Sequence, residues 1–325
     1  MREALFLKQN KERWKTYEQQ PTNDPDELAE RFVQLTDDLA YARTFYPKSK
    51  TVQYLNGLAG KFHLAIYRNK KEKQSRIITF WKYELPLVMA KYQKQLFYAF
   101  LFFSAFITIG VFSAIYDENF VRLILGDGYV NMTNENIENG DPFGVYKKHD
   151  PLLMFLYIAF NNIYVSFVIF VQGLLLGVGT VYGLFYNGVM LGSFEYYFFA
   201  HGLGWQSILV VFIHGTLEIS AIIIAGAAGL ILGTSILFPG TLKRSQSILI
   251  GAKDGIKIII GLLPIFLTAA FFEGFITRHT GMPLWLSIFI LAASLIFIIW
   301  YFVIYPLRMR KRIITEDQIF EADIS

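Results

Sequence analysis

The chain has 325 residues, of which 54% are hydrophobic and only 17% charged, with a formal net charge of +4. Soluble domains usually carry about a quarter charged residues, so this composition indicates a membrane protein. The small net charge and the absence of a basic stripe with interleaved aromatic residues argue against a nucleic-acid partner. Because the sequence contains no cysteine, disulfides, thiolate metal ligands and cysteine nucleophiles are excluded.

Residues 1–94 are predicted to form a cytoplasmic or interfacial helical region. The N-terminus has no continuous apolar run of signal-peptide length, so this region should stay in the cytoplasm. Asp24 followed by Pro25 predicts a helix start, with an N-cap before a proline at the first helical position. Apolar residues then recur every three or four positions, as on a buried helix face: Leu28, Phe32, Leu35, Leu39 and Ala42. A further helix is expected at about 51–67.

Residues 95–307 are predicted to form a transmembrane bundle, because they are strongly apolar and a spanning helix needs about 20 apolar residues. The expected spans are about six: 96–116, two within 152–200, 208–237, one that ends at about Phe275, and 284–305. The two within 152–200 should be separated by a turn near 177–187, and 201–205 should be a connector. The polar segment 117–150 is predicted to be an exposed loop with turns, and 238–257 a basic loop. The predicted fold class is therefore all-α, a polytopic membrane helix bundle after an N-terminal helical region.

Basic residues define the expected topology, because they mark the cytoplasmic side of a membrane. They cluster at 68–73, 243–257 and 308–312. Six spans place all three clusters inside, with both termini cytoplasmic, 117–150 outside the cytoplasm, and 308–325 as a cytoplasmic tail. Five spans would place the last cluster outside. The lipid bilayer is the first expected partner.

Glycines recur at intervals of four within the apolar region. Small residues at this spacing let helices approach closely in lipid, so we expect Gly188, Gly192, Gly229 and Gly233 to lie on packing faces. The same spacing occurs at 173/177, 179/183 and 251/255. Such faces also allow a homodimer within the bilayer.

His214 and Glu218 lie within the apolar stretch 210–233, where an ionisable group costs a few kcal/mol or more. Four residues apart, they share one helix face and can hydrogen-bond each other. One interpretation is a mutually satisfied pair that ties adjacent helices together. The other is direct participation in transport, metal binding or catalysis. Glu273 poses the same question, either as a helix-end salt bridge to Arg278 or as a functional carboxylate.

Further polar residues accompany these in the apolar region, among them Asn161, Asn162 and His201. Asn187 followed by Gly188 predicts a break or turn, which at membrane depth is tolerated only where protein or water satisfies the backbone. The break would either line a transport site or form a re-entrant turn without a ligand. His214, Glu218 and Glu273, with His201 or His279, could in principle hold zinc. Nothing in the spacing fixes their distances, so neither a metal nor another cofactor is predicted.

Several segments resemble the stage II sporulation protein M family. The resemblance is carried by DDLAYARTFYPKS (37–49), YLNGL (54–58), FNNIYVSF (160–167), FYNGVMLGS (185–193), HGTLEISAIIIAGAAGL (214–230), FPGTLKR (238–244) and AAFFEGFIT (269–277). The long helical head resembles the non-sporulation branch, often encoded beside an RDD-type membrane protein and a MoxR-type ATPase. The resemblance implies a bacterial cytoplasmic membrane protein that takes part in an envelope complex with other membrane proteins. It supplies no catalytic residues.

Three functions remain open at this point. The favoured one is a non-enzymatic membrane scaffold or assembly factor of an envelope complex. The alternative is a transporter or channel-like protein for a small molecule, ion or lipid, with His214, Glu218, Glu273 and Asn187 lining a cavity. An intramembrane metal-dependent hydrolase is a weaker third, because neither a nucleophile elbow nor a zinc-protease signature occurs.

Overall fold

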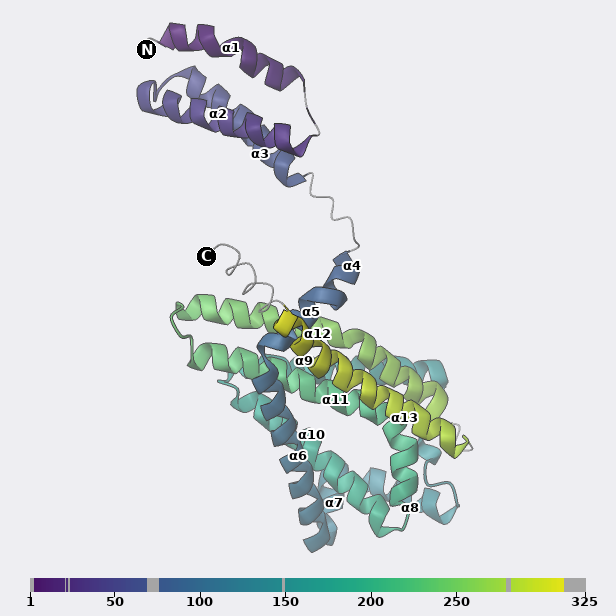
Figure 1. Cartoon of the computed structure of the whole chain (residues 1–325). Helices are drawn as coiled ribbons and strands as arrows, with labels where there is room; N and C mark the ends of the chain where they lie inside the picture. Colours follow the sequence, from purple (N-terminus) through teal and green to yellow (C-terminus); the bar gives the residue numbers. More distant parts are fainter. Residues whose placement is uncertain are drawn as a thin grey trace. The chain divides into compact units, whose positions relative to one another are not determined.

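A computed structural model describes residues 3–20, 22, 24–68, 76–147, 150–278 and 282–312. It consists of helices and turns, with no β-strand among these residues, which confirms the predicted all-α class (Figure 1). The chain divides into two compact units, Met1–Arg76 and Ile77–Ser325. Residues 77–94, which the sequence grouped with the N-terminal region, therefore pack with the second unit.

The first unit contains three helices around a core of its own: α1 (Glu3–Gln19), α2 (Pro25–Phe45) and α3 (Lys50–Arg68). Asp24 caps α2 by accepting a hydrogen bond from the Asp26 amide, as its position before Pro25 predicts. Trp14 is buried, and its indole Nε1–H donates to Asp38 Oδ2 at 2.7 Å. The apolar faces of these three helices are buried against one another, so the first unit has a hydrophobic core separate from that of the membrane region.

The second unit begins with three short helical segments, α4 (Arg76–Thr79), η1 (Phe80–Glu84) and α5 (Leu85–Lys91). The long helix α6 (Gln93–Tyr116) follows, and after it come the shorter helices α7 (Glu118–Leu125) and α8 (Asp127–Glu138). It continues through η2 (Gly144–Lys147), α9 (Pro151–Val171), η3 (Gln172–Leu174), α10 (Val178–Ala200) and α11 (Gly204–Leu237). It ends with α12 (Arg244–Phe271), η4 (Phe272–Thr277), α13 (Leu284–Ile299) and η5 (Trp300–Ile304).

Five of these helical segments are long and apolar enough to cross a membrane: 93–116, 151–174, 204–237, 244–277 and 284–312. The chain is thus a multi-pass membrane protein by helix length and hydropathy, as predicted. The sixth helix expected to span, α10, has 23 residues but falls outside this apolar set, and it carries Asn187 and Glu195.

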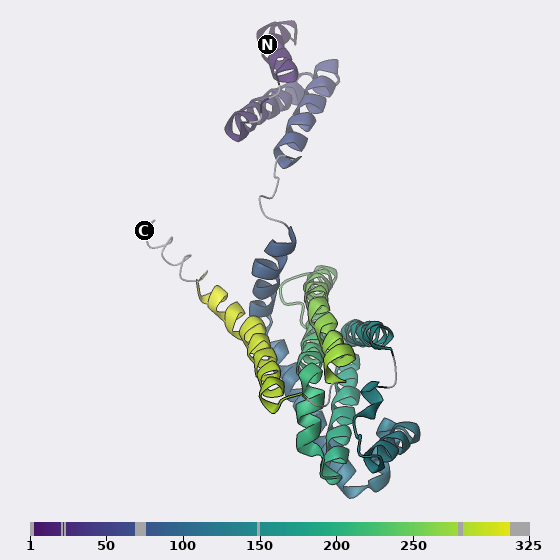
Figure 2. The ribbon, with the colours of Figure 1, turned by 90° about the vertical axis from the view of Figure 1, so that its right-hand side faces the viewer.

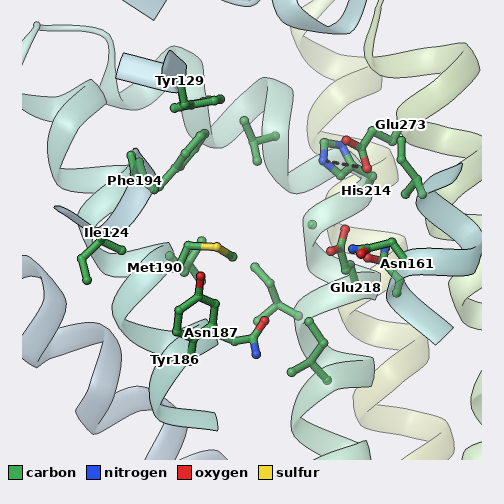
Figure 3. A pocket seen from close by; sticks show the side chains of 18 of the residues that line it. Ile124, Tyr129, Asn161, Tyr186, Asn187, Met190, Phe194, His214, Glu218 and Glu273 are labelled. Carbon is green, nitrogen blue, oxygen red and sulfur yellow. Dashed lines mark ion pairs between the residues drawn. The ribbon is translucent and has the colours of Figure 1, made fainter. Parts of the chain in front are cut away.

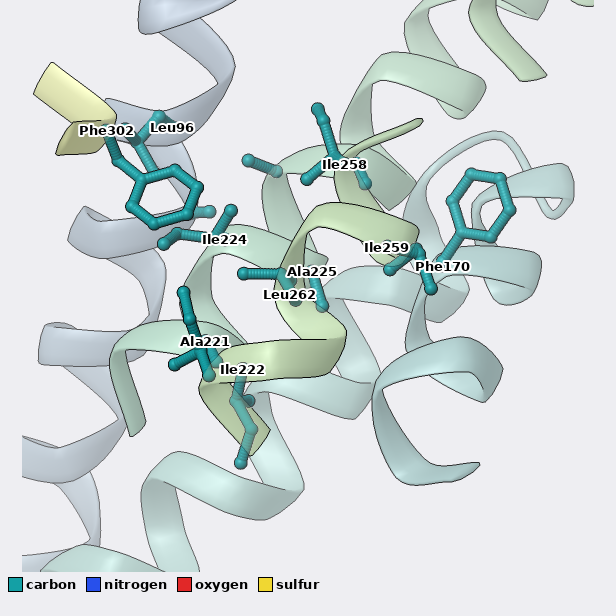
Figure 4. Packing of buried hydrophobic residues seen from close by; sticks show 14 of the residues in the cluster. Leu96, Phe170, Ala221, Ile222, Ile224, Ala225, Ile258, Ile259, Leu262 and Phe302 are labelled. Atoms are coloured by element: carbon teal, nitrogen blue, oxygen red, sulfur yellow. The ribbon is translucent and has the colours of Figure 1, made fainter. Parts of the chain in front are cut away.

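α11 is the central helix of the bundle. Of its most apolar 18 residues 56% are buried, against 22% for the corresponding stretch of α6. α11 packs against α12, α6, α9 and α13. Figure 4 labels Ala221, Ile224 and Ala225 of α11 and Ile258 and Leu262 of α12, which belong to one cluster of buried hydrophobic residues. The inner position of α11 decides which of its side chains face the rest of the bundle.

Glycines allow the helix backbones to meet. A Cβ on Gly192 of α10 would collide with the carbonyl oxygen of Ile107 in α6, and one on Gly188 would lie 2.8 Å from Phe106 Cβ. On α11, a Cβ on Gly229 would lie 2.8 Å from the Ile169 carbonyl oxygen. One on Gly233 would lie 2.5 Å from the Cα of Gly177, and real Cβ atoms do not approach backbone so closely.

The last helical segment is joined to the first part of the second unit. The Tyr301 hydroxyl donates to the Trp81 carbonyl at 2.7 Å, and the Tyr305 hydroxyl donates to the Lys82 carbonyl at 2.9 Å. Gln93 at the start of α6 donates to the Phe302 carbonyl at 2.8 Å. Figure 2 shows the C-terminal helix, in yellow, alongside the segment that leads into α6.

The segments between spans differ from the sequence-based expectation. The prediction of an exposed loop at 117–150 was wrong for most of its length, because it contains α7 and α8. Asp117 caps α7, and Val121 and Val130 are buried against α10 and α11 residues. The turn within 152–200 lies at 172–177, earlier than expected, where Leu176 and Gly177 adopt φ values of 56° and 83°. The basic segment 238–257 is a loop only to Lys243, after which α12 begins.

Gly192→Ala should destabilise the bundle by about 1–3 kcal/mol, because the added methyl has to displace backbone of α6. Thermal unfolding in detergent would measure the loss. The matched control is Gly128→Ala in α8, where nothing lies within 4 Å of an added Cβ. Equal stability of the two variants would contradict the backbone contact between α6 and α10.

A polar cavity in the membrane bundle

A cavity of about 470 Å³ lies in the second unit between α9, α10 and α11, with α7 and α8 contributing to its wall. Apolar and aromatic side chains form most of its lining, and Figure 3 shows α10 and α11 on opposite sides. Its polar lining residues are Tyr129, Tyr157, Asn161, Asn162, Tyr186, Asn187, His214, Glu218 and Glu273. The cavity therefore gathers most of the intramembrane polar residues that the sequence singled out.

His214 is the most enclosed of the ionisable groups, with 4% of its surface exposed. Its Nδ1 lies 3.0 Å from the Thr277 hydroxyl, and its Nε2 lies 3.7 Å from Glu273 Oε2. The sequence suggested Glu218 as the partner of this imidazole. Thr277 and Glu273 both belong to η4, which follows α12, so His214 links α11 to that segment.

Glu218 lies one helical turn after His214 and completes a group of three. One donor atom from each of His214, Glu218 and Glu273 lies within 4.8 Å of the other two. Glu273 reaches the group from η4, a π-helical turn. A π turn inserts an extra residue into a helix, which changes the direction of the side chains that follow, and such turns are frequent at functional sites. The structure thus directs Glu273 toward His214 (Figure 3).

The two asparagines of α9 border this group. Asn162 is 5% exposed, and its side chain is close enough to Glu218 to hydrogen-bond that carboxyl. Asn161 lies beside Glu218 in Figure 3. Buried amides normally find partners, and Glu218 provides one for Asn162 at the wall of the cavity.

Asn187 lies on the opposite wall, within the continuous helix α10. The predicted break at Asn187-Gly188 was wrong, because the Asn187 amide donates to the Gly183 carbonyl at 2.8 Å and the helix continues to Ala200. His201 does not line the cavity. It lies at the end of α10, where its Nδ1 is 2.8 Å from the Tyr197 carbonyl oxygen. His279, considered as an extra ligand, lies outside the described residues.

Sequence reasoning missed several contributors, among them Thr277 and Tyr129. Thr277 had no signal beyond its place four residues after Glu273. Tyr129 belongs to α8, in the segment predicted to be a loop, and its phenol lines the cavity. Burial raises the pKa of Tyr129 to about 12. Its hydroxyl is protonated at neutral pH, as in other tyrosines, and the raised pKa extends this to more alkaline pH.

The polar group has the chemistry of a cation or proton site. In the part of the chain that the structure describes, it is the group of His, Asp and Glu residues whose donor atoms lie close enough together to share one metal ion. An imidazole nitrogen and carboxylate oxygens are ligands that divalent metals accept. The cavity beside them provides space for a further small ligand.

These features define a multi-span helical membrane protein with a polar centre in its bundle. Residues 99–278, more than half of the chain, match the family described as Stage II sporulation protein M. The chain therefore belongs to the stage II sporulation protein M family, and the whole polar group lies within the matched region. Residues 4–68, which cover α1 to α3, match a domain of unknown function (DUF8413). Neither a curated protein nor a solved structure showed significant similarity to the chain.

Thr277→Val should destabilise the bundle by about 1–3 kcal/mol, because it leaves the buried Nδ1 of His214 without the Thr277 hydroxyl. Chemical or thermal unfolding of the purified protein would measure the change. Thr268→Val is the control, since the Thr268 hydroxyl donates to the Pro264 carbonyl of its own helix. An equal effect of both substitutions would argue against a specific role for the His214–Thr277 contact.

Proposed function

We propose that this protein binds a small ion or polar molecule in the cavity, as a transporter or channel-like protein does. The observation that supports this most is the convergence of His214, Glu218 and Glu273 at a cavity of about 470 Å³. Ionisable side chains inside a membrane are costly and usually mark a pathway, a relay or a ligand site. Sequence alone favoured a scaffold, and the cavity changes that order.

A purely structural tie accounts for only part of the arrangement. The contacts of His214 with Thr277 and Glu273 would suffice to hold α11 against η4. Glu218 adds a second carboxyl to a partly enclosed site, and two neighbouring carboxylates repel each other unless a proton or cation lies between them. A ligand of positive charge, or one that donates hydrogen bonds, would offset this cost.

The protein also suits a role as an assembly factor, which we propose as its second function. The supporting observation is the N-terminal unit of three helices, whose own buried core leaves its surface available for contacts. We propose the non-sporulation branch of the family, with an RDD-type membrane protein and a MoxR-type ATPase as partners in the envelope. The two roles are compatible, because they use different units of the chain.

Glu218→Gln should abolish the cellular function while the protein stays at its normal abundance. The substitution removes a negative charge from the cavity and changes the side-chain shape little. The measurement is rescue of a strain that lacks this chain, with the membrane content of the protein determined in parallel. We expect at least a tenfold loss of rescue, a size typical of removing one charged hydrogen-bonding group from a site.

Glu195→Gln is the matched control for this substitution. Glu195 is also a carboxyl in the bundle, within 3.4 Å of the Ser207 hydroxyl, but it does not line the cavity. Its variant should rescue normally. Full rescue by Glu218→Gln would contradict a ligand-binding function of the cavity.

Removal of residues 1–76 should release the partner proteins and leave the rest of the chain in the membrane. The bundle has a separate hydrophobic core, so it does not need the N-terminal unit in order to fold. Cross-linking in native membranes, followed by purification and mass spectrometry, would compare the recovery of RDD-type and MoxR-type proteins. Unchanged recovery would contradict the assembly role of the N-terminal helices.

A further inference from the structure

We infer that His214, Glu218 and Glu273 together bind one divalent transition-metal ion, with Zn²⁺ as the best match to these donors. This inference rests on the proposed ligand-binding function, because it names the class of ligand for the same cavity. The three side chains offer one imidazole nitrogen and two carboxylates. Imidazole favours Zn²⁺ and its first-row neighbours, whereas Mg²⁺ and Ca²⁺ prefer sites made only of oxygen.

The distances suit a single ion after small side-chain movements. Zinc binds nitrogen and oxygen at about 2.0–2.2 Å, so two ligands of a tetrahedral ion lie roughly 3.4 Å apart. His214 Nε2 and Glu273 Oε2 are 3.7 Å apart, close to that spacing. One donor atom from each of the three residues lies within 4.8 Å of the other two, and rotation of the Glu218 side chain can shorten these distances.

The orientation of His214 is the one that a metal ligand needs. Histidines that bind metals through one ring nitrogen usually hydrogen-bond through the other, which fixes the ring and its tautomer. Here Nδ1 lies 3.0 Å from the Thr277 hydroxyl, and Nε2 is directed toward Glu273. Thr277 is therefore a positioning residue for the proposed site, and it comes from the same π turn as Glu273.

Asn162 borders the proposed site. Its side chain is 5% exposed, lines the cavity and is close enough to hydrogen-bond the Glu218 carboxyl. An amide in this place can hold a carboxylate ligand or a water molecule bound to the metal ion in position. Three protein donors also leave at least one coordination position open, as in zinc sites that exchange a water for another ligand.

Metal content and metal affinity of the purified full-length protein test this inference. The protein would carry an affinity tag without histidine, and metals would be quantified by mass spectrometry before any chelator is used. After removal of metals, Zn²⁺ would be titrated against a chromogenic chelator, with Mn²⁺ and Mg²⁺ for comparison. We expect one equivalent of Zn²⁺ per chain, and at least tenfold weaker binding for Glu218→Gln and His214→Gln.

Two further variants keep the test decisive. Glu195→Gln should bind Zn²⁺ like the wild type, and Thr277→Val should bind about 10–100-fold more weakly, as expected for loss of a group that orients a ligand. Size-exclusion and thermal unfolding profiles would establish that each variant is folded. A wild type without a saturable Zn²⁺ site, or folded variants that bind as the wild type does, would overturn the inference.

The outcome also separates this inference from the proposed function. Loss of cellular rescue by Glu218→Gln, without a Zn²⁺ site in the wild type, would support a different ligand in the cavity and reject the metal. The converse result is that Glu218→Gln removes the Zn²⁺ site from the purified protein and still rescues the strain fully. That pair of results would confirm the metal site and reject the proposed function.

Discussion

The close approach of helix backbones at α11 is the contact on which the rest of the bundle depends. Lipid offers no hydrophobic advantage for joining helices, so their association relies on van der Waals packing, which small residues permit. Gly229 and Gly233 let α11 meet the end of α9 and the turn at 172–177. Elsewhere in the bundle, Gly188 and Gly192 of α10 let that helix pack closely against α6. The space left between α10 and α11 is the cavity.

The polar centre follows from this arrangement. α11 supplies His214 and Glu218 on one face, and that face is directed at the cavity because the opposite faces are occupied by apolar packing. The π turn η4 then supplies Glu273 and Thr277 to the same point. Ionisable groups that would be costly against lipid are thus enclosed by protein, with aromatic side chains such as Tyr129 around them.

Much of the fold could be predicted from sequence, because apolar length and periodicity are local properties. His214 and Glu218 were evident for the same reason, as charges within an apolar run. The convergence of Glu273 on them was not, because it depends on helix packing and on a π turn that has no sequence signature. The expected break at Asn187 failed because its amide is satisfied by the preceding turn of its own helix. Residues 117–150 were misjudged because short helices with a few buried valines resemble a polar loop in composition.

The hydrogen bonds from Tyr301 and Tyr305 to the carbonyls of Trp81 and Lys82 join the two ends of the bundle. A ribosome releases residues 80–84 long before it makes the last helix. The tyrosines that donate to this early segment are therefore among the last parts of the bundle to be made. A chain that stops before Tyr301 would lack both donors and leave this seam open.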